Sequence, residues 1–148
     1  MTSSLFNIRP THINELNYYL DKLDKLDWEL FDADCKRVEL ESTNKLIEIL
    51  NNGLGRNKRF DPKKSNIHYV KYDIEGSYIL EEHNDGCRQT IIIYLDKDPS
   101  IKDIFYVDNK LVDNSNWTYN GFIMGGHLKH RGVFNGYGKR EVLCIFMN

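Results

Sequence analysis

The chain has 148 residues, of which 41% are hydrophobic and 28% are charged, and its formal net charge at pH 7 is -2. This size and composition predict one ordinary soluble domain rather than two. The charge gives no electrostatic reason to expect nucleic acid as a partner. No apolar run approaches the length of a transmembrane helix, so no membrane partner is expected.

The three cysteines, Cys35, Cys87 and Cys144, are an odd number without a metal-binding spacing. They predict a reduced, intracellular location, most simply the cytoplasm. Cys144 lies in an apolar segment and is interpreted as a small core residue. A short basic patch, which begins at Arg56 and reaches Lys64, is interpreted as a solvated loop.

Residues 1–60 are predicted to form supporting helices. The first helix has apolar residues at three- and four-residue steps, at Ile13, Leu16, Leu20 and Leu23. Thr11 is its expected N-cap. Residues 42–52 repeat the pattern, and Gly53 is expected to end that second helix. Trp28 and Phe31, between the helices, are interpreted as core anchors.

From Ile67 onward the apolar pattern becomes that of strands. Turn residues separate seven predicted strands, at 67–72, 78–83, 89–95, 104–107, 117–124, 128–133 and 141–147. Short strands without helices between them predict a jelly roll, a double-stranded β-helix, over residues 66–148. The apolar run Ile91–Ile93 should face the barrel interior on one side and the helices on the other. The fold class is therefore mostly β with N-terminal helices, in a single domain of residues 1–148.

One tripeptide and one later histidine carry the strongest chemical signal. Two histidines and a carboxylate form the facial triad of non-haem Fe(II) sites, and His83-Asn84-Asp85 with His130 supplies that set. His83 and Asp85 are two residues apart and should project together. His127 faces away from His130 on the same predicted strand, so only one of them can be a ligand. Taken singly, the tripeptide is also typical of a surface turn, and His130 of a core histidine.

Taken together, these residues and their neighbours resemble the Fe(II)- and 2-oxoglutarate-dependent dioxygenases, nearest to the prolyl-hydroxylase-like branch. The resemblance covers about residues 67–146. The family pattern is a tyrosine-bearing strand, His-x-Asp, a Thr-x3-Tyr-Leu strand, Gly-x3-His-x-Gly and Gly-x-Arg. In this sequence the corresponding residues are Tyr72 and Tyr78, His83–Asp85, Thr90–Leu95, Gly126–Gly132 and Gly138–Arg140.

The resemblance implies that His83, Asp85 and His130 hold Fe(II) as the catalytic metal. The implied reaction hydroxylates a C–H bond with O2 while 2-oxoglutarate is converted to succinate and CO2. It also allows ascorbate as a reductant. The protein would keep coordination positions open and keep water away from the oxidant.

The same resemblance implies which residues bind 2-oxoglutarate. Arg140 would pair with its distal carboxylate, and Tyr94 would donate a hydrogen bond to that carboxylate. Tyr72 would line the pocket and contact either 2-oxoglutarate or the substrate. From the residues alone, Arg140 could instead be an exposed charge at a strand start, and Tyr94 a packing residue.

The expected substrate is a protein or peptide side chain, such as proline. Oxidative nucleic-acid dealkylases carry a second arginine six residues after the first, where this chain has Phe146. Collagen-type prolyl hydroxylases have lysine at the position of Arg140, so the oxygen-sensing or ribosomal type is more similar. The alternatives are a non-catalytic jelly-roll module that binds sugar or peptide, a cupin-type metal enzyme, and a dioxygenase acting on a small molecule or nucleic acid.

Overall fold

The structure is a computed structural model that describes residues 3–55 and 60–148. Residues 56–59, which hold much of the predicted basic loop, lie outside the described residues. Among those described, no helix combines the length and the apolar character that crossing a membrane requires.

Two long antiparallel strands organise the fold. β4 (Ser65–His83) and β9 (His130–Met147) pair along nearly their whole length, from Ser65 opposite Met147 to His83 opposite His130. The C-terminal half of β9 also pairs with β5 (Gln89–Lys97), whereas its N-terminal half pairs with β6 (Lys102–Val107). One continuous strand therefore belongs to two layers.

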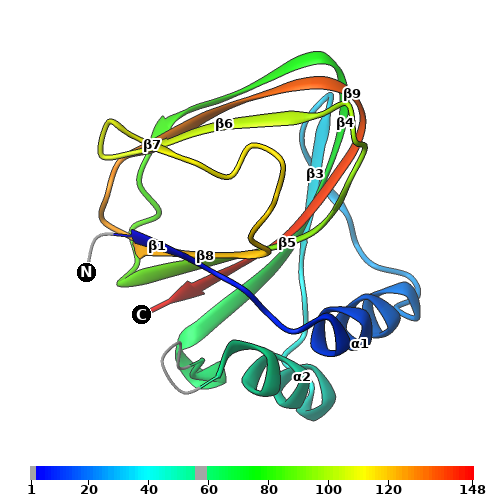
Figure 1. The fold of residues 1–148 in the computed structure, drawn as a ribbon. Coiled ribbons are helices and arrows are strands. Elements are labelled where there is room, and N and C mark those ends of the chain that lie inside the picture. Colours follow the sequence, from blue (N-terminus) through cyan, green and yellow to red (C-terminus); the bar gives the residue numbers. More distant parts are fainter. Residues whose placement is uncertain (1–2, 56–59) are drawn as a thin grey trace.

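The remaining strands extend these two layers (Figure 1). The lower layer continues from β5 to β8 (Gly121–Gly125) and β1 (Ser3–Phe6). On the other side of β4 lie β3 (Cys35–Glu39) and the edge strand β2 (Glu29–Asp32). In the upper layer, β6 pairs with β7 (Lys110–Val112). Both layers are antiparallel, so the fold is mostly antiparallel β-sheet, with two α-helices among the described residues.

Paired glycines let the two long strands bend together. Gly76 of β4 lies opposite Gly136 of β9, and their φ angles are +94° and +140°. Residues with a side chain are strained at such angles. Gly136 also has no space for one, because a Cβ atom there would lie 2.6 Å from the carbonyl oxygen of Ser100. The bend carries both strands from one layer to the other (Figure 1).

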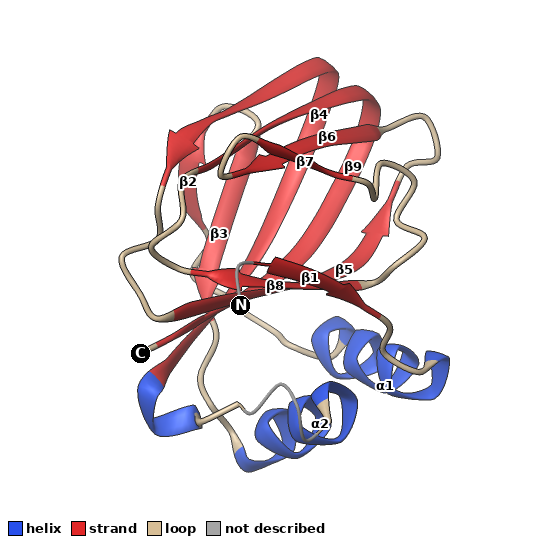
Figure 2. Cartoon of the chain, turned by 60° about the vertical axis from the view of Figure 1, so that its left-hand side comes forward, coloured by secondary structure: helices blue, strands red, loops and turns tan. Residues whose placement is uncertain are grey.

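The helices cover only the lower layer, as Figure 2 shows. α1 (Pro10–Asp21) and α2 (Asn44–Leu54) bury leucine and isoleucine side chains against it. The Thr43 hydroxyl caps α2 by accepting a hydrogen bond from the Leu46 backbone N–H at 3.2 Å. A one-turn 3₁₀ helix, η2 (Pro62–Lys64), leads into β4. One face of the lower layer therefore packs on helices, and the other faces the upper layer.

A second core fills the space between the layers. Its members come from the inner faces of both layers and include Ile74, Phe122, Phe134 and Val142. Within β5, Ile91 and Ile93 belong to the helix-side core, whereas Ile92 packs against this second core. The two-sided apolar character expected of Ile91–Ile93 therefore matches its position between the helices and the interior.

Several local predictions were wrong. The predicted strands 67–72 and 78–83 are one strand, as are 128–133 and 141–147, because pairing continues through the glycine bends. Trp117 lies in a turn with φ +56° rather than in a strand. The short strands β1, β2, β3 and β7 were not predicted. Such short segments lack a clear apolar pattern and depend on their partner strands.

The helix ends and one proposed core residue also differ from the sequence interpretation. α1 begins at Pro10 after Arg9, so Thr11 is inside the helix and is not its N-cap. Gly53 lies within α2, which ends at Leu54 with Gly55 as C-cap. Phe31 is 57% exposed and is not a core anchor. Its strand is the sheet edge, where one side has no neighbour.

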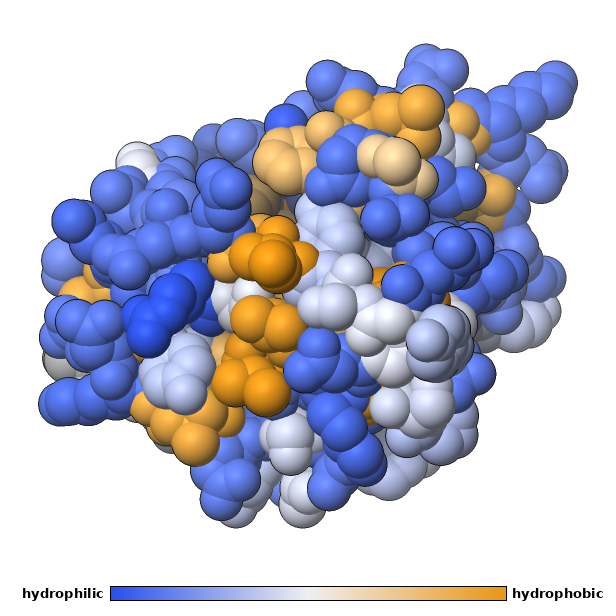
Figure 3. Space-filling model, turned by 90° about the horizontal axis from the view of Figure 1, so that it is seen from above, coloured by the Kyte–Doolittle hydropathy of each residue, from blue (hydrophilic) through white to orange (hydrophobic). Residues whose placement is uncertain are grey.

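Exposed apolar side chains lie on the outer side of the upper layer. Ile79 of β4 and Ile104 of β6 are both opposite Val133 of β9, and Leu111 of β7 is also exposed. Figure 3 shows the molecule from this side, with apolar groups among hydrophilic ones. Scattered exposed hydrophobic residues are normal on protein surfaces.

Replacing Gly136 by Ala should lower the free energy of unfolding by about 3 kcal/mol, because strained φ and the contact with Ser100 add together. Gly86→Ala is the matched control. Its φ is +67° but nothing lies within 4 Å of the added Cβ, so it should cost about 1 kcal/mol. Urea unfolding followed by circular dichroism measures both. Equal losses would contradict the steric role of Gly136.

Candidate metal centre

Three side chains gather at one end of the two long strands. His83 ends β4, Asp85 follows two residues later, and His130 begins β9 opposite His83. One ligand atom from each residue lies within 4.8 Å of the others. Among the described residues, this is the group of histidine, cysteine and acidic side chains that could hold a metal ion. The His127 side chain is exposed in the preceding turn and is not part of it.

Backbone carbonyl groups fix the orientation of both imidazole rings. Nδ1 of His83 lies 2.7 Å from the Glu81 carbonyl oxygen, and Nδ1 of His130 lies 3.0 Å from that of Leu128. Because a carbonyl oxygen can only accept, each Nδ1 donates its hydrogen. This second-shell arrangement is typical of metal-binding histidines, because it leaves the Nε2 lone pair for the metal.

The three ligand atoms face one point. Nε2 of His83 and of His130 lie 3.5 and 3.3 Å from Oδ1 of Asp85. With neutral imidazoles that donate through Nδ1, two Nε2 lone pairs and Oδ1 of Asp85 would face a bound cation at this point. The hydrogen bond to Asp85 raises the pKa of His83 against the effect of burial. The set therefore fits a divalent cation with nitrogen and oxygen ligands.

The second carboxylate oxygen of Asp85 is held by Thr90. The buried Thr90 hydroxyl donates to Oδ2 at 2.7 Å, and the Cys87 thiol lies 3.3 Å from the same hydroxyl. Burial raises the pKa of Asp85, but hydrogen bonds from His130, His83 and Thr90 outweigh it and hold that pKa below its usual range. Asp85 therefore stays ionised with Oδ1 directed at the histidines.

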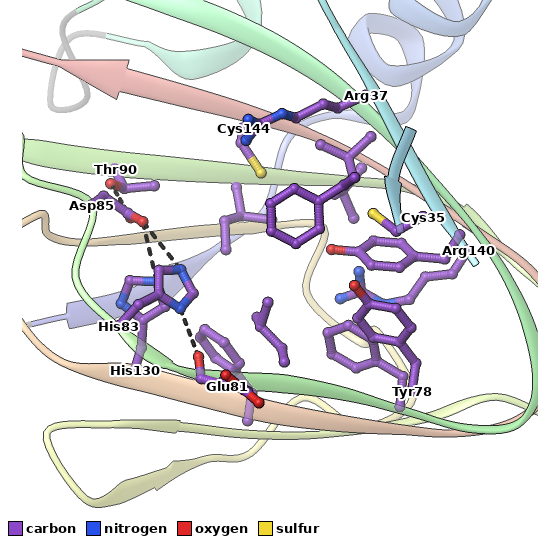
Figure 4. A pocket seen from close by; sticks show the side chains of 18 of the residues that line it. Cys35, Arg37, Tyr78, Glu81, His83, Asp85, Thr90, His130, Arg140 and Cys144 are labelled. Atoms are coloured by element: carbon purple, nitrogen blue, oxygen red, sulfur yellow. Dashed lines mark hydrogen bonds and ion pairs between the residues drawn. The ribbon is translucent and has the colours of Figure 1, made fainter. Parts of the chain in front are cut away.

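These residues line one end of a cavity between the two layers. The cavity measures about 490 Å³, a volume typical of sites that bind small molecules. Figure 4 shows the triad on one side and Arg140 with Tyr78 on the other. The exposed residues Phe31, Glu81 and Glu82 also line it, so it is open to solvent on that side.

Arg140 lies within the same cavity but already has an acidic partner. Its Nη2 donates to Oδ2 of Asp103 at 2.7 Å, and its Nε lies 3.1 Å from Oδ1. Trp117 donates through its indole nitrogen to the same carboxylate at 2.7 Å, and the Phe134 ring lies 3.7 Å from the guanidinium carbon. Burial alone would lower the pKa of Arg140, but the charge of Asp103 raises it. The interpretation of Arg140 as an exposed strand-start charge is therefore wrong.

Tyr72 and Tyr94 are buried and line the cavity with Arg140. Tyr72 lies opposite Arg140 in the β4–β9 pair, with the guanidinium carbon 4.9 Å from its ring. Tyr94 packs against Trp117 with ring centroids 4.9 Å apart. Burial raises the pKa of both phenols, so each is neutral and can donate one hydrogen bond. The cavity therefore contains every residue that the sequence analysis assigned to a site.

Two features of the cavity were missed by the sequence analysis. Asp103 occupies an inward position of β6, between the inward residues Ile101 and Phe105. A charged residue at an inward strand position signals a buried partner, and that signal was available. Arg37 comes from β3, which was not predicted as a strand. Cys144, interpreted as a core residue, is partly buried and lines the cavity as well.

No protein-family model and no curated protein match the sequence, but solved structures share its fold. A prolyl-4-hydroxylase from Pseudomonas putida matches with a TM-score of 0.60 and 11% identity, covering 99% of this chain and 91% of that chain. A 2OG-Fe(II) oxygenase family oxidoreductase from Burkholderia pseudomallei has a TM-score of 0.58 and 9% identity, covering 90% and 77%. KdgF from Halomonas sp. has a TM-score of 0.51 and 12% identity, covering 82% and 86%. At these identities the likeness shows the cupin and jelly-roll fold alone.

Replacing Thr90 by Val should weaken metal binding by about 10- to 100-fold, because Asp85 loses the hydrogen bond that orients its carboxylate. Val has nearly the same shape as Thr, and Thr90→Ser, which keeps the hydroxyl, serves as the control. Competition of Fe(II) or Co(II) with a chromophoric chelator measures the affinity. A Thr90→Val protein that binds metal as tightly as the wild type would show that Thr90 does not position the ligand.

Proposed function

We propose that this protein is an Fe(II)- and 2-oxoglutarate-dependent dioxygenase that hydroxylates a C–H bond. The observation that carries the proposal is the convergence of His83, Asp85 and His130 within 4.8 Å at the end of a cavity. Two imidazoles and one carboxylate leave metal positions open for a chelating co-substrate and O2. The matches to two oxygenases with TM-scores of 0.58 and 0.60 support it at the level of the fold.

The bound iron and 2-oxoglutarate would supply the oxidising chemistry, with succinate and CO2 as products. The chain itself orients the ligands through the carbonyl groups of Glu81 and Leu128 and the hydroxyl of Thr90. The aromatic and aliphatic lining of the cavity limits water around the site.

Arg140 would bind the distal carboxylate of 2-oxoglutarate, although Asp103 offsets its charge. Nε and Nη2 of Arg140 both donate to Asp103, whereas Nη1 makes no hydrogen bond with the described residues. A guanidinium can therefore hold Asp103 with one edge and a ligand with Nη1. Tyr94 would donate its hydroxyl to the same carboxylate, and Tyr72 would complete the wall. Because Asp103 competes electrostatically with the ligand, 2-oxoglutarate should bind less tightly than at an unpaired arginine.

The substrate class that we carry forward is a protein or peptide side chain such as proline. The fold-level match to a prolyl-4-hydroxylase is compatible with it. An RmlC-like cupin from Shewanella frigidimarina, which shares the fold with a TM-score of 0.50 at 12% identity, favours a second candidate, a metal-dependent cupin-type enzyme or binding module. Cupin sites generally use more histidines and a glutamate, and the described residues offer two histidines and one aspartate at this site.

Replacing His83 by Ala should abolish succinate formation from 2-oxoglutarate in the presence of Fe(II), because one of three metal ligands is lost. His127→Ala removes a nearby exposed histidine and should retain activity. Succinate is measured with a panel of proline-bearing peptides, and circular dichroism confirms folding. Wild-type turnover in His83→Ala would rule out the triad, and absence of succinate from the wild-type protein would favour the cupin-type alternative.

The Arg140–Asp103 pair gives a charge test, in which a double variant removes both buried charges together. Asp103→Asn should lower the 2-oxoglutarate concentration needed for half-maximal succinate formation, because it removes the competing carboxylate. The double variant Asp103→Asn with Arg140→Gln should raise that concentration by about 10-fold or more, since a charged hydrogen bond is worth roughly 1.5–3 kcal/mol. An unchanged requirement in both proteins would show that the co-substrate is anchored elsewhere.

A further inference from the structure

A second arginine faces the cavity and has no role in the proposed co-substrate site. Arg37 lies on β3 and lines the cavity together with Cys35. Val38, the next residue along the strand, belongs to the helix-side core. Arg37 is opposite Val70 of β4, and Val70 is opposite Val142 of β9. Both valines line the cavity. Figure 4 shows the Arg37 side chain reaching over the cavity from its strand.

Three of the four acidic residues that line the cavity, Asp32, Asp85 and Glu82, have other partners. Asp32 accepts hydrogen bonds from the Tyr78 hydroxyl at 2.5 Å and from the Asp34 backbone N–H at 2.9 Å. Asp85 faces the two histidines and Thr90. Glu82 lies 3.9 Å from the Arg131 guanidinium. None of these carboxylates offsets the charge of Arg37.

Arg37 has no ion pair with any of the described residues. Three acidic residues lie near it: Glu29 directly opposite on β2, Glu39 next on the same face of β3, and Glu81 at the solvent side of the cavity. None of the three forms an ion pair with it. Its contact is the Phe31 ring, whose centroid lies 5.1 Å from the guanidinium carbon. A flat aromatic surface leaves all five N–H donors of a guanidinium free. Of these two arginines in the cavity, Arg140 is in an ion pair with Asp103 and Arg37 is in none.

The two arginines start from different places in the sheet. Arg140 lies opposite Tyr72, whereas Arg37 lies opposite Val70, which is a step of about 7 Å along the strand. β4 lies between their strands, adding about 10 Å across the sheet. Arg37 can therefore serve an anionic group other than the distal carboxylate that we assign to Arg140.

We infer that Arg37 is the binding site for a carboxylate group of the primary substrate, beside the apolar wall formed by Val70 and Val142. Calling the ligand a substrate rests on the proposed function, whereas the anion site at Arg37 does not depend on it. The substrate is then an acid, either a small molecule or a peptide with an acidic residue next to the hydroxylated one. Arg37 positions it by a charge-assisted hydrogen bond, and the valines contact its hydrocarbon part.

The test uses benzoate and its uncharged isostere benzamide with metal-free protein. Methyl NMR of Val70 and Val142 should show benzoate binding at the cavity wall, with affinity at least tenfold above benzamide. Arg37→Gln should remove this preference, and Arg37→Lys should restore part of it. Lys36→Gln, which removes the neighbouring exposed charge on the opposite face, should leave it unchanged. Equal benzoate affinity in wild type and Arg37→Gln overturns the inference.

Two matched peptides separate the sources of the carboxylate. If acetyl-Glu-Pro-amide binds more tightly than acetyl-Gln-Pro-amide and the difference depends on Arg37, the substrate is an acidic peptide. If only benzoate depends on Arg37, the substrate is a small acid. Succinate formation without Arg37-dependent benzoate binding would refute this inference and leave the proposed function intact. Arg37-dependent benzoate binding without succinate formation would support the anion site and count against the proposed function.

Discussion

The pairing of β4 with β9 is the constraint on which the rest of the structure depends. Because the two strands stay in register through the glycine bend, they fix two distant places at once. At one end His83 is opposite His130, and beyond the bend Tyr72 is opposite Arg140. The metal ligands and the co-substrate anchor are thus held by the same pair of strands, on opposite sides of one cavity (Figure 4). A shift in register would separate both pairs together.

Within this frame, the polar groups of the cavity differ in how completely they are satisfied. Asp103 is fully engaged by Arg140 and Trp117, and Asp32 by Tyr78 and a backbone N–H. The triad gathers two imidazoles and one carboxylate around one point, and Arg37 faces the cavity with no ion pair among the described residues. Buried or half-buried polar groups are normally paired. We propose these two places as the sites of a metal ion and of an anionic ligand.

Strand parity and residue spacing predicted much of the cavity but little of its edges. His83, Asp85 and His130 lie together in the structure, as their spacing indicated, and helices lie at Pro10–Asp21 and Asn44–Leu54. β3 has one clearly apolar residue, Val38, so its strand state comes from pairing with β4. That is why Arg37 was missed. The glycine segments read locally as turns, but pairing between distant residues made each part of a continuous strand. The roles of Tyr72, Tyr94 and Arg140 toward a ligand stay predictions.

The central claim is that Fe(II) and 2-oxoglutarate bind together at the triad. Its most direct test is the visible absorption spectrum of the protein under anaerobic conditions, recorded with Fe(II) before and after addition of 2-oxoglutarate. Chelation of the iron by the 2-oxo acid should produce a weak charge-transfer band that is absent with Fe(II) alone. A protein that binds Fe(II) but develops no band at saturating 2-oxoglutarate would contradict the account.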